Sequence, residues 1–248
     1  MILTVVIGNT NTRFAWFRGH RLVRFRVVPT AAVCHGRLPG SRRAAAVAVA
    51  SVVPGATRVV RAHLRADAGL RPFVVGPRTH TGLRFRYRRE DLGADRVCAA
   101  VGARHRFPNQ DLLVFDFGTA TTVNVILREG IFAGGAILPG IRMSLDALAA
   151  GTAGLPKLLP AGMRNPVQHN TRAAVQAGVA NLFAGGIERI IDRTEHALGR
   201  SFLVVSTGGA ASIARRYSKR LGILTPYLAS EGLAELLYLN RREGTERP

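Results

Sequence analysis

The feature that most constrains the fold of this chain is a stretch that occurs twice. Residues 5–28 read as a strand, a turn rich in Gly, Asn and Thr, a second strand, a Gly19-His20 turn and a third strand. Residues 115–137 repeat this order, with a Gly-Thr turn after the first strand and a Glu129-Gly130 turn after the second. One such turn alone would be ordinary, whereas two copies with matched flanks indicate an internal repeat. The sequence therefore predicts two related halves.

The first turn of each copy has the composition of a phosphate-binding loop. Gly lets the backbone bend close to a ligand, while the following amides and the polar groups of Asn and Thr can point at phosphate oxygens. Two such hairpins facing one another could clamp the phosphates of a nucleotide. The duplicated turn is therefore the first candidate site.

Strand and helix patterns alternate between and after the two hairpins. The spacing predicts helices at 56–66, 95–105, 142–150, 171–198, 210–217 and 231–239, and strands at 45–53, 72–75 and 203–206. This alternation predicts an α/β fold with mixed sheets. Residues 107–110 separate two segments that each begin with a hairpin, so we expect domains at 1–108 and 109–248.

Composition favours a soluble globular protein. The chain has 248 residues, of which 47% are hydrophobic, and no apolar run approaches the roughly 20 residues of a membrane span. The N-terminal residues read as a strand and not as a signal peptide, so we expect a cytoplasmic protein without a membrane partner. Cys34 and Cys98 lie far apart with no His cluster nearby, which predicts two buried free thiols and neither a disulfide nor a structural zinc site.

The formal net charge of +20 is the most unusual bulk property. Such a charge can support binding to nucleic acid or to another polyanion. The arginines are scattered, however, and no nucleic-acid-binding motif accompanies them. Lys157 and Lys219 are the only lysines, so a compositional bias explains the charge as well as a binding surface does. We expect a solvated basic surface, and a regulatory protein that contacts nucleic acid is the minority hypothesis.

The motifs of this chain, in their joint order and spacing, resemble those of type III pantothenate kinases, which belong to the acetate kinase, sugar kinase, Hsp70 and actin superfamily. The matching segments are Ile7-Gly8-Asn9-Thr10-Asn11-Thr12, Ser51-Val52-Val53-Pro54, Leu92-Gly93-Ala94-Asp95-Arg96, Asp116-Phe117-Gly118-Thr119-Ala120-Thr121-Thr122, Gly134-Gly135-Ala136-Ile137-Leu138-Pro139-Gly140, Asn170-Thr171 and Thr207-Gly208-Gly209. The resemblance implies two actin-like (ribonuclease H-like) domains with mixed sheets flanked by helices and an ATP cleft between them. It also implies a homodimer that phosphorylates pantothenate with ATP, the first step of coenzyme A biosynthesis.

The resemblance implies a role for each matching residue. Asp95 would accept the proton of the attacking hydroxyl, and Arg96 would bind the pantothenate carboxylate. Asp116 would bind the activating K⁺ or NH₄⁺, or help to hold Mg²⁺. ATP contacts are implied for Gly8, Asn9, Thr10, Asn11, Thr12, Thr119, Gly208 and Gly209, and pantothenate contacts for Gly93, Ala94, Asp95, Arg96 and Thr171. Taken alone, Thr171 is also compatible with an N-cap of the long helix.

One position departs from the family pattern. Family members ordinarily carry Asp immediately before the Ile-Gly of the first hairpin, and this chain has Val6 there. In the aligned repeat Asp116 stands opposite Val6, and a valine cannot bind Mg²⁺ through water. An active kinase is the leading hypothesis, and the alternative is a catalytically impaired member that binds nucleotide or pantothenate as a regulatory protein. Tyr87 is given no substrate role, because the surrounding stretch lacks the proline that is common there.

Overall fold

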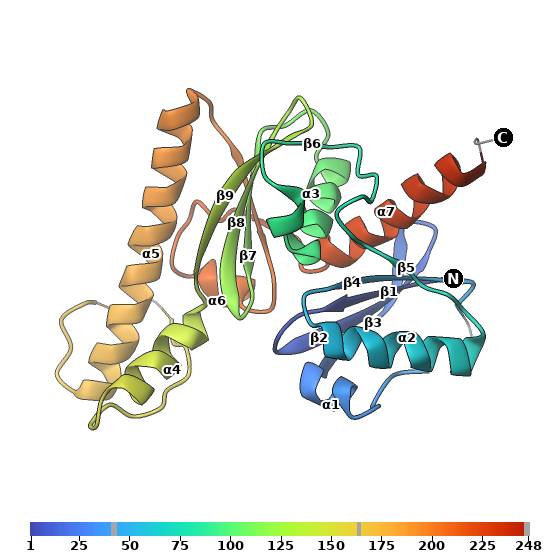
Figure 1. The fold of residues 1–248 in the computed structure, drawn as a ribbon. Helices are drawn as coiled ribbons and strands as arrows, with labels where there is room; N and C mark the ends of the chain where they lie inside the picture. The colour runs from blue at the N-terminus through green and yellow to red at the C-terminus, as the bar shows by residue number, and fades with distance from the viewer. Residues whose placement is uncertain (41–43, 163–164, 246–248) are drawn as a thin grey trace. The chain divides into compact units, whose positions relative to one another are not determined.

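A computed structural model describes residues 1–40, 44–162 and 165–245 of the chain (Figure 1). The chain divides into two compact units. The first comprises Met1–Pro108, Glu129–Phe132 and Tyr227–Pro248, and the second comprises Asn109–Arg128 and Ala133–Pro226. The sequence-based boundary was also drawn between residues 108 and 109, but it assigned the C-terminal helix to the second domain, whereas the contacts group that helix with the first unit.

The first unit is built on a five-stranded sheet in the order β3-β2-β1-β4-β5. Its strands are β1 (Ile2–Ile7), β2 (Asn11–Arg18), β3 (Arg21–Pro29), β4 (Ala46–Ser51) and β5 (Phe73–Val74). Strands β1 to β3 are antiparallel neighbours, while β4 runs parallel to β1 and β5 runs parallel to β4. A buried apolar cluster joins one face of this sheet to α1 (Thr30–Cys34) and α2 (Pro54–Ala68).

Two further helices of this unit, α3 (Ala94–Arg106) and α7 (Leu228–Thr245), pack on one another and against strands β1 and β4, on the side of the sheet away from α2 (Figure 1). Their backbones meet at two glycines: a Cβ added to Gly232 would lie 2.6 Å from the backbone N of Gly102. No side chain fits at such a distance, so Gly at both positions lets the two helices cross closely. This contact fixes α3, whose first turn carries Asp95 and Arg96.

The second unit repeats the strand order of the first. Its strands are β7 (Leu112–Phe117), β8 (Ala120–Leu127), β9 (Ile131–Pro139), β10 (Leu203–Thr207) and β11 (Ile223–Leu224), in the order β11-β10-β7-β8-β9. Strand β8 is antiparallel to β7, whereas β10 runs parallel to β7 and β11 parallel to β10. Replacing β1–β5 by β7–β11 reproduces the first sheet, so the internal repeat predicted from the sequence is confirmed, as is the α/β class with mixed sheets.

The remaining elements are α4 (Ile141–Gly151), α5 (Thr171–Leu198) and α6 (Ala211–Ala214) of the second unit, and β6 (Arg84–Phe85) and the 3₁₀ helix η1 (Arg89–Asp91) of the first. β6 pairs in parallel with Ile131 and Phe132, the first two residues of β9. Within the described residues, no helix combines the length and the apolar character that crossing a membrane requires.

Two expectations from the sequence are corrected by the structure. The helix expected at 210–217 is only the four-residue α6, because the chain leaves the helix before Tyr217, whose hydroxyl donates to the carbonyl of Ala161 at 2.7 Å. Cys34, expected in the core, is exposed at the end of the short helix α1, whereas Cys98 is buried as expected.

Candidate functional site

The turn after β1 is held by hydrogen bonds on one side and has exposed side chains. The backbone N–H of Gly8 donates to the carbonyl of Asn11 at 3.1 Å, and the hydroxyl of Thr30 donates to the carbonyl of Gly8 at 2.7 Å. The hydroxyls of Thr12 and Thr30 lie 3.0 Å apart. Since Thr30 uses its proton on Gly8, Thr12 is the donor of that pair, and its buried side chain supports the turn. The exposed side chains of the turn are Asn9, Thr10 and Asn11.

Val6, at the departure from the family pattern, is buried in the strand that leads to this turn. Only 1% of its surface is exposed, and its neighbours in the sheet are Arg13 on β2 and Ala50 on β4. The backbone N–H of Val52 donates to the carbonyl of Ile7 at 3.1 Å, which extends the pairing of β1 and β4 to the edge where the turn begins. The carboxyl ends of β1 and β4 therefore meet beside the first turn.

Asp95 lies at the same edge of the first sheet. It is in the first turn of α3, where its Oδ1 accepts from the backbone N–H of Arg96 at 2.8 Å. A Cβ added to Gly93 would be 2.6 Å from Asp95 Oδ1 and 3.5 Å from Cγ1 of Val52. Gly93 thus leaves the room that the carboxylate occupies next to the end of β4. The helix N-terminus favours a negative charge at this position.

Arg96 is a nearly buried cation in an aromatic setting. Its exposed fraction is 5%, and its guanidinium carbon lies 5.3 Å from the ring centre of Tyr87 and 5.6 Å from that of Phe132. The two rings meet edge to face with their centres 6.0 Å apart. Aromatic rings at these distances stabilise and orient a guanidinium. The pairing of β6 with the start of β9 brings Phe132 close to this part of the chain.

Tyr87 is the residue of this site to which the sequence assigned no role. Its ring is one of the two that contact the Arg96 guanidinium. An isolated Tyr in an Arg-rich loop gives no sign of its partner, because the contact is created by the tertiary fold. The available signal was the abundance of nearby arginines, any of which could have used an aromatic surface.

Burial and a nearby charge both raise the pKa of Cys98, which follows Asp95 on α3. The structure buries Cys98 on α3, and this burial raises the pKa of its thiol well above the ordinary value, with a further contribution from the charge of Asp95. Cys98 is thus a neutral core residue at neutral pH. The thiol of Cys98 therefore carries no charge beside Asp95.

A pocket of about 380 Å³ opens at the carboxyl ends of β4 and β5. Ligands of open α/β sheets bind at this edge, where the strands end and the helices begin. The side chains that line it are apolar, hydroxyl-bearing or cationic: Ser51, Val52, Pro54, Thr57, Arg58, Arg61, Val74 and Val75. The pocket shares Val52 with the surroundings of Gly93 and Asp95.

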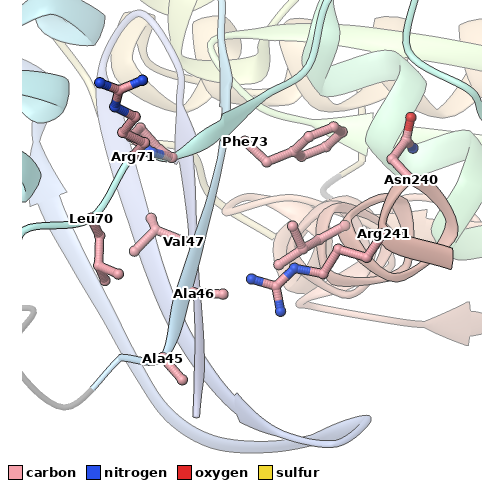
Figure 2. A pocket seen from close by; sticks show the side chains of 10 residues that line it. Ala45, Ala46, Val47, Leu70, Arg71, Phe73, Asn240 and Arg241 are labelled. Carbon is pink, nitrogen blue, oxygen red and sulfur yellow. The ribbon is translucent and has the colours of Figure 1, made fainter. Parts of the chain in front are cut away.

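A second pocket, of about 280 Å³, lies at the opposite edge of the same sheet. Figure 2 shows the side chain of Arg241 of α7 directed toward Ala46 at the start of β4, and Asn240 on the side of Phe73 of β5. These are the amino ends of the strands, away from the Gly8 turn and from Asp95. This pocket is therefore not part of the candidate site.

The turn after β7 is the counterpart of the Gly8 turn in the second unit. Asp116 is the penultimate residue of β7 and pairs with Thr122 on β8 and Thr207 on β10. The backbone N–H of Gly118 donates to the carbonyl of Ala120 at 3.1 Å, which closes the turn. Thr119, at the tip, is exposed.

Two glycines from distant loops pack their backbones onto this second turn. A Cβ added to Gly208 would fall on Oδ1 of Asp116 and 2.7 Å from the backbone N and C of Phe117. A Cβ added to Gly140 would fall on the carbonyl of Thr119. Gly208 has φ +93°, a conformation that side chains rarely tolerate. Its neighbour Gly209 has open space around it. Asp116, Thr119, Gly208 and Gly209 are thus brought together at one end of β7 and β10.

Thr171 is the first residue of α5, and its side chain is exposed. The N-cap is the preceding residue, Asn170, whose Oδ1 accepts from the backbone N–H of Ala173 at 2.9 Å. A single cap of this kind satisfies one of the free N–H groups at the helix start. The N-cap role considered for Thr171 is therefore filled by Asn170.

Comparison with known proteins gives consistent results. The family model of type III pantothenate kinase matches residues 2–193. A type III pantothenate kinase from Moorella thermoacetica is 33% identical over 257 aligned positions, which cover 94% of this chain and 97% of that protein. Among solved structures, a Baf family protein from Campylobacter jejuni matches with a TM-score of 0.63 at 20% identity, covering 97% of this chain and 99% of that one.

A more distant solved structure extends the likeness in fold. The activator of 2-hydroxyisocaproyl-CoA dehydratase from Clostridium difficile, with bound ADPNP, matches with a TM-score of 0.53 at 12% identity, over 100% of this chain and 98% of that one. The likeness agrees with the expected two-domain, actin-like class. Because the family model covers most of the chain and a relative above 30% identity covers nearly all of it, this protein belongs to the type III pantothenate kinase family.

Proposed function

We propose that this chain transfers the γ-phosphoryl group of ATP to the primary hydroxyl of pantothenate, forming 4′-phosphopantothenate and ADP. The observation that carries the proposal is the pair Asp95–Arg96 at the start of α3, with Arg96 held against two aromatic rings, in a chain of this family. A carboxylate and a cation at adjacent positions suit a substrate that has a hydroxyl at one end and a carboxylate at the other.

In this reaction Asp95 accepts the hydroxyl proton as the hydroxyl oxygen forms its bond to the γ-phosphorus. The bond between that phosphorus and the bridging oxygen of ADP breaks, and ADP leaves with the electron pair. Arg96 binds the pantothenate carboxylate, and the aromatic contacts of its guanidinium reduce the number of orientations it can adopt. Gly93 and Ala94 leave room for the substrate beside the Asp95 carboxylate, and Thr171 supplies a further polar contact to the substrate.

The phosphates of ATP are assigned to both Gly-Thr turns. The exposed groups of the first turn, from Gly8 to Asn11, would donate to phosphate oxygens, and Thr12 would support the turn through Thr30. In the second unit Thr119 would add a donor. The backbone at Gly208 and Gly209, where a strand ends and a helix begins, allows a nucleotide to approach closely.

Asp116 is the residue that fits a cation in this proposal. Its carboxylate is a hard oxygen ligand at the end of β7, and Mg²⁺ is commonly held by one or two carboxylates together with substrate phosphates. Mg²⁺ would neutralise phosphate charge during the transfer. The alternative ion for this carboxylate is the activating monovalent cation, K⁺ or NH₄⁺. Family membership also supports a cytoplasmic homodimer.

Replacing the proposed base tests the reaction. Asp95→Asn keeps the size of the side chain and removes the proton acceptor, so kcat should fall about 10²–10⁴-fold. The assay is ADP release that depends on pantothenate, at saturating ATP, Mg²⁺ and K⁺. Asp91→Asn, at an exposed aspartate of η1, is the matched control and should keep the rate. An Asp95→Asn enzyme with native circular dichroism and a rate equal to that of the control would refute the assignment.

A further inference from the structure

Outside the proposed active site, three metal-binding side chains converge in the first unit. His20 lies in the β2–β3 turn, His105 in the last turn of α3, and Glu235 in the middle of α7. One ligand atom from each lies within 4.8 Å of the others. They come from three separate elements, and their wide separation in the sequence explains why no motif spacing revealed them.

The distances suit a bound metal ion better than direct hydrogen bonds. Oε2 of Glu235 is 3.7 Å from Nδ1 of His20 and 3.6 Å from Nδ1 of His105. Both distances exceed the usual hydrogen-bond range of about 2.7–3.2 Å. Two ligands of a tetrahedral Zn²⁺ are about 3.3–3.6 Å apart, as follows from metal–ligand bonds of about 2.0–2.2 Å. Rotation of the two stacked imidazole rings would direct both Nδ1 atoms, together with Oε2, at one ion.

The carboxylate oxygen at the centre of this cluster is shielded from water. Within the described residues, Oε2 of Glu235 is buried and has no hydrogen-bond partner. A buried carboxylate oxygen without a partner is costly. A cation shared with the two imidazoles would satisfy it.

The surrounding contacts keep the two histidines next to each other. The ring of His20 stacks on that of His105 with centres 5.2 Å apart and lies 5.1 Å from the ring centre of Tyr238. The hydroxyl of Tyr238 donates to the carbonyl of Gly19 at 3.1 Å, which ties the β2–β3 turn to α7. The Tyr238 hydrogen bond therefore keeps the turn that carries His20 beside α7.

We propose that His20, His105 and Glu235 form a binding site for a divalent transition metal, with Zn²⁺ as the preferred ion, and that the ion joins the β2–β3 turn to α3 and α7. Two imidazoles and one carboxylate are a ligand set that Zn²⁺ accepts, whereas Mg²⁺ prefers oxygen ligands alone. The site is separate from the proposed Mg²⁺ ligand, Asp116. An ion here would stabilise the helix pair that carries Asp95, since a ligand that binds only the folded state shifts unfolding.

Calorimetric titration with ZnCl₂ tests the site on the full chain, without a histidine tag and after treatment with a chelator. The expected result is one equivalent of Zn²⁺ bound with a Kd below about 0.1 mM, and a higher melting temperature that MgCl₂ at the same concentration does not produce. Co²⁺ bound at the same site should give visible absorption bands of a four-coordinate ion.

Substitutions then locate the ion. His105→Ala and Glu235→Gln should each weaken Zn²⁺ binding at least about tenfold, since even outer partners of metal ligands contribute 10–100-fold. His63→Ala is the matched control, because His63 also faces a carboxylate, that of Asp67 at 4.0 Å, on α2. If His105→Ala does not fold, Glu235→Gln gives the same comparison with nearly unchanged size. Weaker binding than the stated limit, or unchanged affinity in the folded variants, would overturn the proposal.

Discussion

At Gly208 both the backbone conformation and the neighbouring atoms oppose the addition of a single methyl group. Gly208→Ala forces a side chain into φ +93°, which costs about 1–2 kcal/mol. The new Cβ would also fall on Asp116 Oδ1 and 2.7 Å from backbone atoms of Phe117, an overlap worth about 1–3 kcal/mol. Together the free energy of unfolding should fall by roughly 2–5 kcal/mol, a large share of a typical total of about 5–15 kcal/mol.

Urea unfolding followed by far-ultraviolet circular dichroism measures this loss. Gly209→Ala is the matched control, because a Cβ there meets no atom within 4 Å, and it should change stability by at most about 1 kcal/mol. The melting temperature of Gly208→Ala should fall by about 2–4 °C for each kcal/mol lost. If Gly208→Ala is as stable as Gly209→Ala, the turn after β10 does not press on the end of β7, and the described packing around Asp116 is wrong.

Two further predictions concern residues of the first unit. Val6→Asp should raise kcat, most clearly at low Mg²⁺, because it adds a carboxylate before the Gly8 turn. It should also lower the free energy of unfolding, because the position is buried. A rate no higher than that of Val6→Asn would show that Val6 does not limit catalysis. Burial and Asp95 raise the pKa of Cys98, so its thiol stays protonated in the folded chain after it ionises in the unfolded one. The unfolded state then binds fewer protons, and the free energy of unfolding should fall as pH rises above the ordinary thiol value of 9.0. A Cys98→Ala variant that keeps the same slope between pH 9 and 10 would contradict this origin.

Local pattern was sufficient to predict the hairpins, the alternation of strands and helices, and the long helix 171–198, which has those bounds in the structure. These features depend on hydrophobic period and turn residues a few positions apart. The burial of Thr12 could also be predicted from the sequence. Thr12, Phe14 and Trp16 are alternate residues of one strand, and Phe14 and Trp16 lie in the core that α1 covers.

Features that depend on contacts between distant residues could not be predicted. The grouping of α7 with the first unit arises from the close backbone contact of Gly102 and Gly232. A glycine in a helical pattern does not indicate which other helix will pack against it. The aromatic contacts of Arg96 depend likewise on strand pairing that brings Phe132 near. Cys34 is exposed although its neighbour Val33 is buried, because successive residues of a helix point to different sides.

The two copies of the hairpin have diverged in how their turns are supported, and this bears on the loss of the carboxylate at Val6. The first turn rests on the hydroxyls of Thr12 and Thr30 and presents neutral polar side chains. The second is packed by the backbone at Gly140 and Gly208, with the carboxylate of Asp116 against it. On the proposed function, neutral donors for phosphate come from the first turn and the charge that binds a cation comes from the second. Since Mg²⁺ can be held by one carboxylate and substrate phosphates, the proposal requires only Asp116 as a protein ligand for Mg²⁺ when position 6 is a valine.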